Sequence, residues 1–249
     1  MHGRFVWYDL ITPDIDGAVK FYGKVVGWGT QQWNGPQQYT MWENAGAPIG
    51  GVVKPDAGMG EMPQWLPYVE VDNVDTTAQL ATGLGAVIIA QPRDIPGSGR
   101  YAIMRDPQGA NIGIFASTNP TTSEFKPKRG EFSWHELMTD DHMKALEFYN
   151  RLFGWTSMGE FDMGPIGTYT EYGDGSEMYG GMFSKSSDMN MPNSWCCYAM
   201  VDDARKAADT ATHLGAQIIN GPMEVPGGSW VAQGIDPQGV MFAVHSLPA

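Results

Sequence analysis

The sequence predicts an α+β fold made of two tandem copies of one domain, with each copy built from two βαβββ modules. Residues 5–28 (FVWYDLITPDIDGAVKFYGKVVGW) match residues 132–155 (FSWHELMTDDHMKALEFYNRLFGW) at an offset of 127 positions. From Tyr39 onward the offset is 130, so the second copy carries three additional residues between Trp155 and Tyr169. A register held along nearly the whole of both copies indicates an internal duplication.

The two copies meet at a polar segment that contains two prolines, STNPTTSEFKPKRG. Such composition is typical of a linker. We therefore expect a first domain at 1–116, a linker at 117–130 and a second domain at 131–249. A chain of 249 residues has the length of two ordinary domains.

The first module begins with a strand, which the alternation of apolar residues at 5–11 predicts. Asp14 marks the start of a helix, apolar residues follow at helical spacing from Ile15 to Val25, and Gly27 ends the helix. Two strands are expected after it, at 38–43 and 49–54.

The second module repeats this order from residue 65. A strand at 65–71 precedes a helix that runs from Val74 to Gly85. Strands are expected at 86–90, 100–105 and 111–116, and the turn sequence DPQG joins the last two. The second copy carries the same DPQG turn.

Charge and composition limit the partners of the chain. It has 28 acidic and 15 basic residues, a formal net charge of −13, and no basic cluster denser than Lys126-Pro127-Lys128-Arg129. Nucleic acid is therefore disfavoured as a partner. No apolar run reaches the roughly 18 residues of a membrane-spanning helix, and no signal sequence is apparent, so a cytoplasmic protein without a membrane partner is expected.

Several motifs occur in both copies: a first strand W-x-[DE]-L, the helix endings FYGKVVGW and FYNRLFGW, a strand ending V-D-[ND], a helix ending L-G-A, and DPQG. Together they resemble the vicinal-oxygen-chelate superfamily, which includes glyoxalases, bleomycin-resistance proteins and extradiol dioxygenases. Within it, the chain resembles a two-domain branch labelled glyoxalase-like or hydroxylase-like. The resemblance covers nearly the whole chain.

The resemblance implies two glyoxalase-like domains whose modules pair into half-open β cups. In this family each cup normally holds a divalent metal that chelates two neighbouring oxygens of the substrate. The usual ligand positions correspond here to Trp7, Leu66, Gly113, Trp134, Cys196 and Ala243. Only Cys196 carries a metal-binding group, and one thiolate does not hold a metal. We therefore expect no metal at these positions and no cofactor, and a divalent metal held at a shifted site by Glu136 and His245 is the weaker alternative.

Strand parity predicts which other side chains face the cups, because residues two apart point the same way. The first cup is expected to present Trp7, Asp9, Ile11, Leu66, Tyr68, Glu70, Asn111, Gly113 and Phe115. The second is expected to present Trp134, Glu136, Met138, Cys196, Tyr198, Met200, Met241, Ala243 and His245. His135 is expected to face the helix layer instead.

The second cup holds the candidate catalytic residues. Glu136 and His245 lie on strands that the family uses to converge on one point, so together they would act as a general base and its orienter, with Tyr198 as a polarising donor. A structural role for Glu136 is an equal alternative. For Asp9, a hydrogen bond to a neighbouring Trp or Tyr is the favoured interpretation. His245, close to the C-terminus, is expected to lie partly in water.

The remaining candidates are expected to line the cups and bind a ligand: Trp134, Met138, Cys196, Met200, Met241, Trp7, Asp9, Tyr68 and Phe115. These features favour a protein that binds a small metabolite or antibiotic in a metal-poor aromatic cup, for sequestration or modification. The alternatives are an active glyoxalase-like lyase or hydroxylase, and a metal-independent acid-base enzyme. A monomer or a homodimer is expected, because each chain already contains two complete cups.

Overall fold

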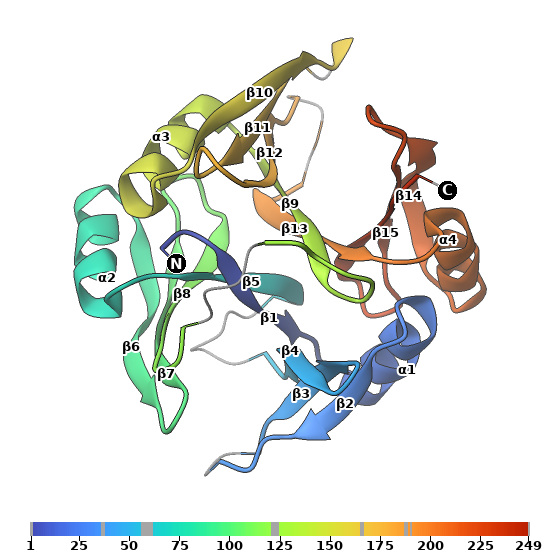
Figure 1. The fold of residues 1–249 in the computed structure, drawn as a ribbon, viewed down its shortest axis with the longest axis horizontal. Coiled ribbons are helices and arrows are strands. Elements are labelled where there is room, and N and C mark those ends of the chain that lie inside the picture. The colour runs from blue at the N-terminus through green and yellow to red at the C-terminus, as the bar shows by residue number, and fades with distance from the viewer. Residues whose placement is uncertain are drawn as a thin grey trace. The chain divides into compact units, whose positions relative to one another are not determined.

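The computed structural model describes residues 2–35, 38–55, 62–120, 125–164, 167–186, 189 and 191–248. In these residues, two eight-stranded mixed sheets are accompanied by four helices. The predicted α+β class and the tandem modules are confirmed. Each module contributes a strand, a helix and three further strands in that order (Figure 1).

The strands of the first sheet follow the order β2-β3-β4-β1-β5-β8-β7-β6, and those of the second sheet follow the order β10-β11-β12-β9-β13-β16-β15-β14. The elements of the first copy are β1 (Phe5–Ile11), α1 (Ile15–Val25), β2 (Gly29–Gln32), β3 (Thr40–Asn44), β4 (Ala47–Val53), β5 (Gln64–Glu70), α2 (Val74–Gly83), β6 (Val87–Ile95), β7 (Gly99–Arg105) and β8 (Asn111–Ser117). Those of the second copy are β9 (Phe132–Thr139), α3 (His142–Phe153), β10 (Thr156–Asp162), β11 (Thr168–Gly173), β12 (Met178–Ser184), β13 (Ser194–Met200), α4 (Ala204–His213), β14 (Gln217–Glu224), β15 (Trp230–Ile235) and β16 (Met241–Ser246).

The predicted elements agree with the observed ones with two exceptions in the first copy. Strand β6 was predicted at 86–90 but runs from Val87 to Ile95, and strand β2, with the sequence GTQQ, was not predicted. Its residues are polar and mostly exposed at the edge of the sheet, so they carry no alternation of apolar and polar side chains. Helix α1 begins where the sequence predicts, because Asp14 caps it by accepting a hydrogen bond from the backbone N–H of Gly17.

The chain forms two compact units, and each unit combines one module from each copy. Unit 1 contains Met1–Val6, Leu66–Phe125 and His135–Trp195, and unit 2 contains Trp7–Trp65, Lys126–Trp134 and Cys196–Ala249. Within unit 1, α2 contacts α3, and within unit 2, α1 lies beside α4 (Figure 1). The domain boundaries predicted at residues 116 and 131 separate the two copies of the repeat and not the two compact units, so they stay a prediction.

Reciprocal hydrogen bonds between the copies hold each unit together. In unit 1 the Tyr149 hydroxyl donates to Asp106 Oδ2 at 2.9 Å, and in unit 2 the Tyr22 hydroxyl donates to Asp236 Oδ2 at 2.9 Å. Each aspartate also accepts backbone N–H groups of its own DPQG turn. Burial raises the pKa of Asp106 and of Asp236. The repeated FY and DPQG motifs therefore join one copy to the other.

Aromatic side chains form the core beside these bonds. In unit 1 the rings of Phe5 and His135 are stacked 3.8 Å apart, and in unit 2 the rings of Tyr8 and Phe132 lie 4.0 Å apart. These are the same repeat positions with the copies exchanged. Buried aromatic pairs of this kind contribute both apolar area and specific geometry.

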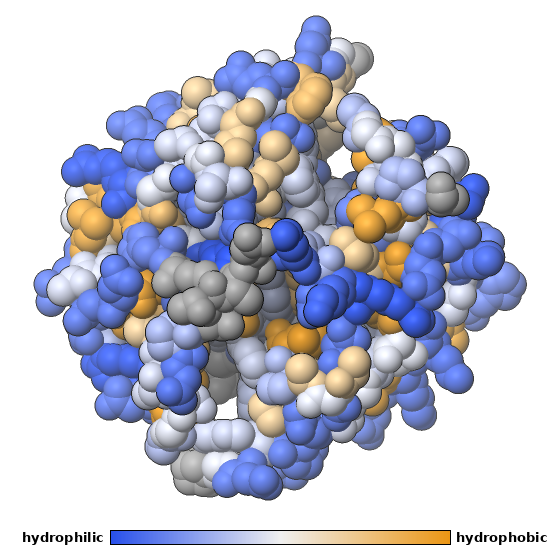
Figure 2. Space-filling model, in the orientation of Figure 1, coloured by the Kyte–Doolittle hydropathy of each residue, from blue (hydrophilic) through white to orange (hydrophobic). Residues whose placement is uncertain are grey.

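The surface mixes hydrophilic and apolar side chains (Figure 2). Large apolar residues that are exposed include Val87, Met143 and Phe161. None of the helices in the described part of the chain is both long and apolar enough to cross a membrane.

Candidate functional site

Three neighbouring strands of unit 2 carry the candidate site. In β13, β16 and β15, Tyr198 is in register with Ala243, and Ala243 with Gln233. The next row joins Met200, His245 and Val231 in the same way. We call the side chains on this side of β13, β15 and β16, together with Trp134, the second-copy face.

The centre of the second-copy face is apolar and buried. Cys196, Tyr198 and Ala243 form a buried cluster, each no more than 5% exposed. Trp134, Val231 and Met241 pack against this cluster and are only partly buried. The structure thus brings together five residues that strand parity placed on one face, namely Trp134, Cys196, Tyr198, Met241 and Ala243.

A chain of polar side chains crosses this face. Asn220 Nδ2 donates to Gln233 Oε1 at 2.9 Å, and Gln233 Nε2 donates to the Tyr198 hydroxyl oxygen at 2.6 Å. Sequence reasoning missed Gln233 and Asn220. The signal was a break in the repeat, because the first copy has Ile103 and Ala90 at these two positions.

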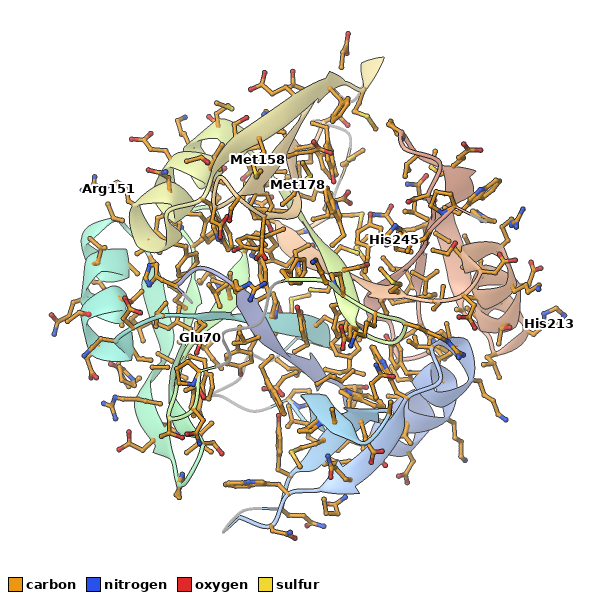
Figure 3. The ribbon with its side chains drawn as sticks, in the orientation of Figure 1. Glu70, Arg151, Met158, Met178, His213 and His245 are labelled. Carbon is orange, nitrogen blue, oxygen red and sulfur yellow. The ribbon has the colours of Figure 1, made fainter. Side chains whose placement is uncertain are left out.

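His245 lies half-buried on β16, beside β15 (Figure 3). Its Nδ1 is 2.9 Å from the Ser133 hydroxyl, which also donates to the Tyr198 carbonyl oxygen at 3.4 Å. Glu136 was the expected partner of this ring, whereas the partner of Nδ1 is Ser133. The difference arises because the start of β9 runs along the end of β13, where Gly130 donates to the Met200 carbonyl. Burial lowers the pKa of His245.

Glu136 lies in unit 1 and accepts a hydrogen bond from Tyr169. The Tyr169 hydroxyl donates to Glu136 Oε2 at 2.9 Å. The Tyr169 ring covers Gly181, the residue in register with Glu136, and a Cβ on Gly181 would lie 2.1 Å from that ring. Met138, the other predicted residue on this strand, is in register with Phe183. Tyr169 was missed, although its repeat partner Tyr39 marked it.

The first copy has a tighter version of the same contact in unit 2. Asp9 Oδ1 accepts from the Tyr39 hydroxyl at 2.5 Å and from Trp7 Nε1 at 3.2 Å. Trp7 Nε1 also donates to the Tyr39 hydroxyl at 2.8 Å. Asp9 is 4% exposed. A hydrogen bond from Asp9 to a neighbouring Trp or Tyr was the favoured interpretation, and both are present. They hold the Trp7 and Tyr39 side chains against strand β1.

The remaining first-copy candidates lie in unit 1, on β5, β7 and β8. Tyr68 is in register with Gly113, and a Cβ on Gly113 would lie 2.1 Å from the Tyr68 ring. Phe115 is in register with Tyr101 and with Glu70. Burial raises the pKa of Glu70, which is labelled in Figure 3. We call this set, on β5, β7 and β8, the first-copy face.

His135 points into the core, as parity predicts. It is fully buried, its ring stacks on Phe5, and its Nδ1 lies 2.8 Å from the Tyr179 carbonyl oxygen. Burial lowers the pKa of His135 to about 3, so the ring is neutral at neutral pH. A buried, neutral and hydrogen-bonded imidazole has a structural role here.

The positions that would hold the family's metal do not fit one. A divalent metal needs several N, O or S donors, whereas these positions carry two indoles, Leu66, Gly113, Cys196 and Ala243. The Tyr68 ring fills the space over Gly113, and Leu66 is fully buried. Among the described residues, no group of three or more His, Cys, Asp or Glu side chains is placed to hold a metal ion.

A family comparison accounts for the duplicated architecture. The model of the Glyoxalase/Bleomycin resistance protein/Dioxygenase superfamily matches the chain twice, at residues 4–114 and 131–244. The chain belongs to this superfamily. The predicted resemblance is therefore confirmed, and the two matches correspond to the two copies.

Relatives of this superfamily extend over nearly the full chain. "Putative glyoxylase CFP32" of Mycobacterium bovis is 30% identical over 96% of this chain and 92% of its own length. Anthracycline biosynthesis protein DnrV of Streptomyces peucetius is 26% identical over 98% of this chain and 94% of its own length. The Mn(II)-bound glyoxalase of Novosphingobium aromaticivorans shares the fold, with a TM-score of 0.66 at 16% identity, over 98% of this chain and 82% of that one.

The predicted catalytic residues are divided between the two units. Tyr198 and His245 lie in unit 2 and Glu136 lies in unit 1. Each has a defined hydrogen-bond partner within its own unit, namely Gln233, Ser133 and Tyr169. Joint action of Glu136 and His245 stays a prediction.

Proposed function

We propose that the chain binds a small planar or apolar molecule on the second-copy face, for sequestration or modification of a metabolite or antibiotic. The observation that carries this proposal is the polar chain Asn220–Gln233–Tyr198 within an apolar wall. A buried amide is costly unless it is hydrogen-bonded, and the first copy does without one. A polar chain that is present only in the second copy would supply the placed polar groups with which a face recognises a ligand.

The composition of the wall supports the same proposal. Trp134 and Met241 are partly exposed beside the buried cluster. Aromatic and thioether side chains provide large apolar contact area, and a few placed polar groups then fix orientation. The relative named for anthracycline biosynthesis supports a link to small-molecule antibiotics. Since the family's metal positions lack donors, recognition would rest on these side chains alone.

The test compares matched tyrosines in the two copies. A panel of planar aromatic compounds is screened by native mass spectrometry, and binders are titrated by tryptophan fluorescence. Tyr198→Phe removes the hydroxyl that Gln233 holds and is expected to weaken binding about five- to tenfold, the effect of one hydrogen bond. Tyr68→Phe is the control and is expected to leave affinity unchanged. Equal loss in both variants would refute the assignment to the second copy.

An active glyoxalase-like lyase is the second candidate function. The name of the 30% identical relative and the glyoxalase fold neighbour favour it. The measurement is lactoylglutathione formation from methylglyoxal and glutathione, with and without added Zn, Ni, Fe or Mn, together with elemental analysis of the purified protein. Stoichiometric metal and turnover that a chelator abolishes would establish this candidate over the binding protein. A hydroxylase would be tested in the same preparation.

A metal-independent acid-base enzyme is the third candidate, and Glu136 carries it. Glu136→Gln keeps the size of the side chain and an acceptor for the Tyr169 hydroxyl, but it cannot take up a proton. Turnover lost with ligand affinity retained would support a general base. Glu171→Gln on strand β11 is the control, because the Glu171 carboxylate lies over Gly159 of the edge strand β10, and β12 separates β11 from the strand of Glu136. Equal turnover in Glu136→Gln and the parent protein would eliminate this role.

We further propose that the protein works in the cytoplasm as a monomer or homodimer. Both cups are encoded in one chain, so a second chain is not needed to complete either of them. Sedimentation or light scattering on the purified chain decides between the two states.

A further inference from the structure

The Ser133 hydroxyl and His245 Nδ1 share one hydrogen bond, and the neighbouring carbonyl bears on which of the two donates it. Within the described residues, the Ser133 hydroxyl contacts two groups, His245 Nδ1 at 2.9 Å and the Tyr198 carbonyl oxygen at 3.4 Å. A carbonyl oxygen only accepts, and a serine hydroxyl has one proton to donate. When that proton goes to the carbonyl, the Ser133 oxygen must accept from His245. His245 then carries its proton on Nδ1.

In this arrangement the second ring nitrogen, Nε2, carries a lone pair. Nε2 of His245 makes no hydrogen bond to a described residue, and it is not among their buried unsatisfied atoms, so it is accessible to solvent. The tautomer of a histidine is set by the bond that its other nitrogen makes. Burial lowers the pKa of the ring, which favours the neutral form. An unprotonated Nε2 is a hydrogen-bond acceptor directed away from Ser133.

The surroundings of this acceptor are those of the second-copy face. His245 is in register with Val231 and Met200, one row from Ala243 at the centre of the face. The first copy has no equivalent, because Val6 and Phe115 occupy the positions of Ser133 and His245. The pair arose or was kept only in the copy that carries the polar chain.

We propose that Ser133 is a positioning residue that fixes His245 in its Nδ1–H tautomer, so that Nε2 accepts a hydrogen bond from a hydroxyl group of the bound molecule. The inference rests on the proposed function of the second-copy face. It narrows the ligand class to planar aromatic molecules that carry a phenolic hydroxyl. His245 is then the group that touches the ligand.

The tautomer is tested without any ligand, by long-range 15N–1H correlation spectra of the histidine side chains. His245→Gln assigns the signals. The expected result is a protonated Nδ1 and an unprotonated Nε2 in the parent protein and in Ser133→Thr, which keeps the hydroxyl. Ser133→Ala is expected to shift the proton to Nε2. Ser246→Ala is the control, because Ser246 is buried beside His245 and its hydroxyl oxygen accepts from the backbone N–H of Ala204 instead. A protonated Nε2 in the parent protein would overturn the proposal.

The ligand class is tested with 2-hydroxyanthraquinone and its parent anthraquinone, titrated by tryptophan fluorescence at a pH below the pKa of the probe hydroxyl. The hydroxyl is expected to improve affinity about fivefold to tenfold. Ser133→Ala should abolish this preference, and Ser133→Thr and Ser246→Ala should keep it. Equal affinity for both probes, or binding of neither, would overturn the ligand class. Failure of the proposed function is measured separately, because the compound panel and Tyr198→Phe test whether the second-copy face binds any ligand.

Discussion

The two copies share their framework but differ on the faces that would meet a ligand. On the first-copy face, Tyr68 lies over Gly113 with Ile103 and Phe115 nearby in the sheet register. On the second-copy face, the tyrosine of the same repeat position, Tyr198, is held by Gln233, and His245 replaces the phenylalanine. Duplication kept the scaffold and changed the chemistry of one face.

The shared framework explains why the motifs are repeated so closely. Each FY tyrosine binds the DPQG aspartate of the other copy, in unit 1 and in unit 2 alike. Each Gly-Trp tryptophan likewise donates to a backbone carbonyl of the other copy, Trp28 to Gly130 and Trp155 to Gly3, both at 2.7 Å. These contacts restrain both copies equally. Divergence is therefore confined to positions outside them, which is where the candidate site lies.

The largest expected difference between the copies is their response to acid, and it comes from His135. Its pKa is about 3 in the folded chain, against about 6.5 for a histidine in an unfolded chain. Between these values the unfolded chain binds more protons than the folded one, so stability falls as the pH falls. The loss between pH 7 and pH 4 is about 3 kcal/mol. The first copy has Tyr8 at this position, which gains no charge in acid.

His135→Phe tests this difference by urea unfolding at pH 7 and pH 4. The variant is expected to lose about 1 kcal/mol at pH 7, because the bond to the Tyr179 carbonyl disappears. Its stability should then change less between the two pH values than that of the parent. The exposed His213 provides the control, as His213→Gln should leave the acid response intact. An unchanged pH slope in His135→Phe would contradict the account.

The next largest effect should be the same in both units. Tyr22→Phe and Tyr149→Phe each remove a donor from a buried carboxylate, Asp236 or Asp106. Loss of a hydrogen bond to a charged group costs about 2 kcal/mol. Chemical denaturation of the two variants measures it. Costs that differ by more than the experimental error would show that the two units are not equivalent scaffolds.

Exchanging Ile103 and Gln233 between the copies should give smaller losses of folding stability, and the two losses should be unequal. Ile103→Gln places an amide at a fully buried position where Ala90 replaces the asparagine partner, and it is expected to cost about 2 kcal/mol. Gln233→Ile is expected to cost about 1 kcal/mol, since it removes bonds to Tyr198 and Asn220 but adds apolar volume. Denaturation midpoints give both values. If Ile103→Gln were the milder change, the contrast between the faces would be wrong.

Much of the fold could be predicted because the repeat is nearly complete. Strand parity placed His135 on the side opposite the cup, where it is buried. It also placed Trp134 on the same face as Cys196 and Ala243, against which it packs. Parity works where a strand pairs without interruption, since alternate residues then keep their faces. What the sequence could not show is which module joins which in a compact unit, because the helices α1 to α4 present similar apolar faces to either partner.

The polar contacts of the candidate site were beyond sequence reasoning for a local reason. Strand β14 shifts its register against β15 on both sides of Asn220. Such bulges break the alternation, so the contact of Asn220 with Gln233 does not follow from the place of Asn220 in the strand. The contact between Ser133 and His245 joins residues 112 positions apart and depends on how β9 runs along β13. The alternation of side chains within one strand does not show which other strand lies beside it.

The central claim is that the second copy alone carries the ligand site, and a crystal structure with the tightest binder from the aromatic panel tests it most directly. The account predicts one bound molecule per chain, in contact with Trp134, Met241 and His245. A molecule bound instead against Tyr68 and Phe115, or one in each copy, would contradict it.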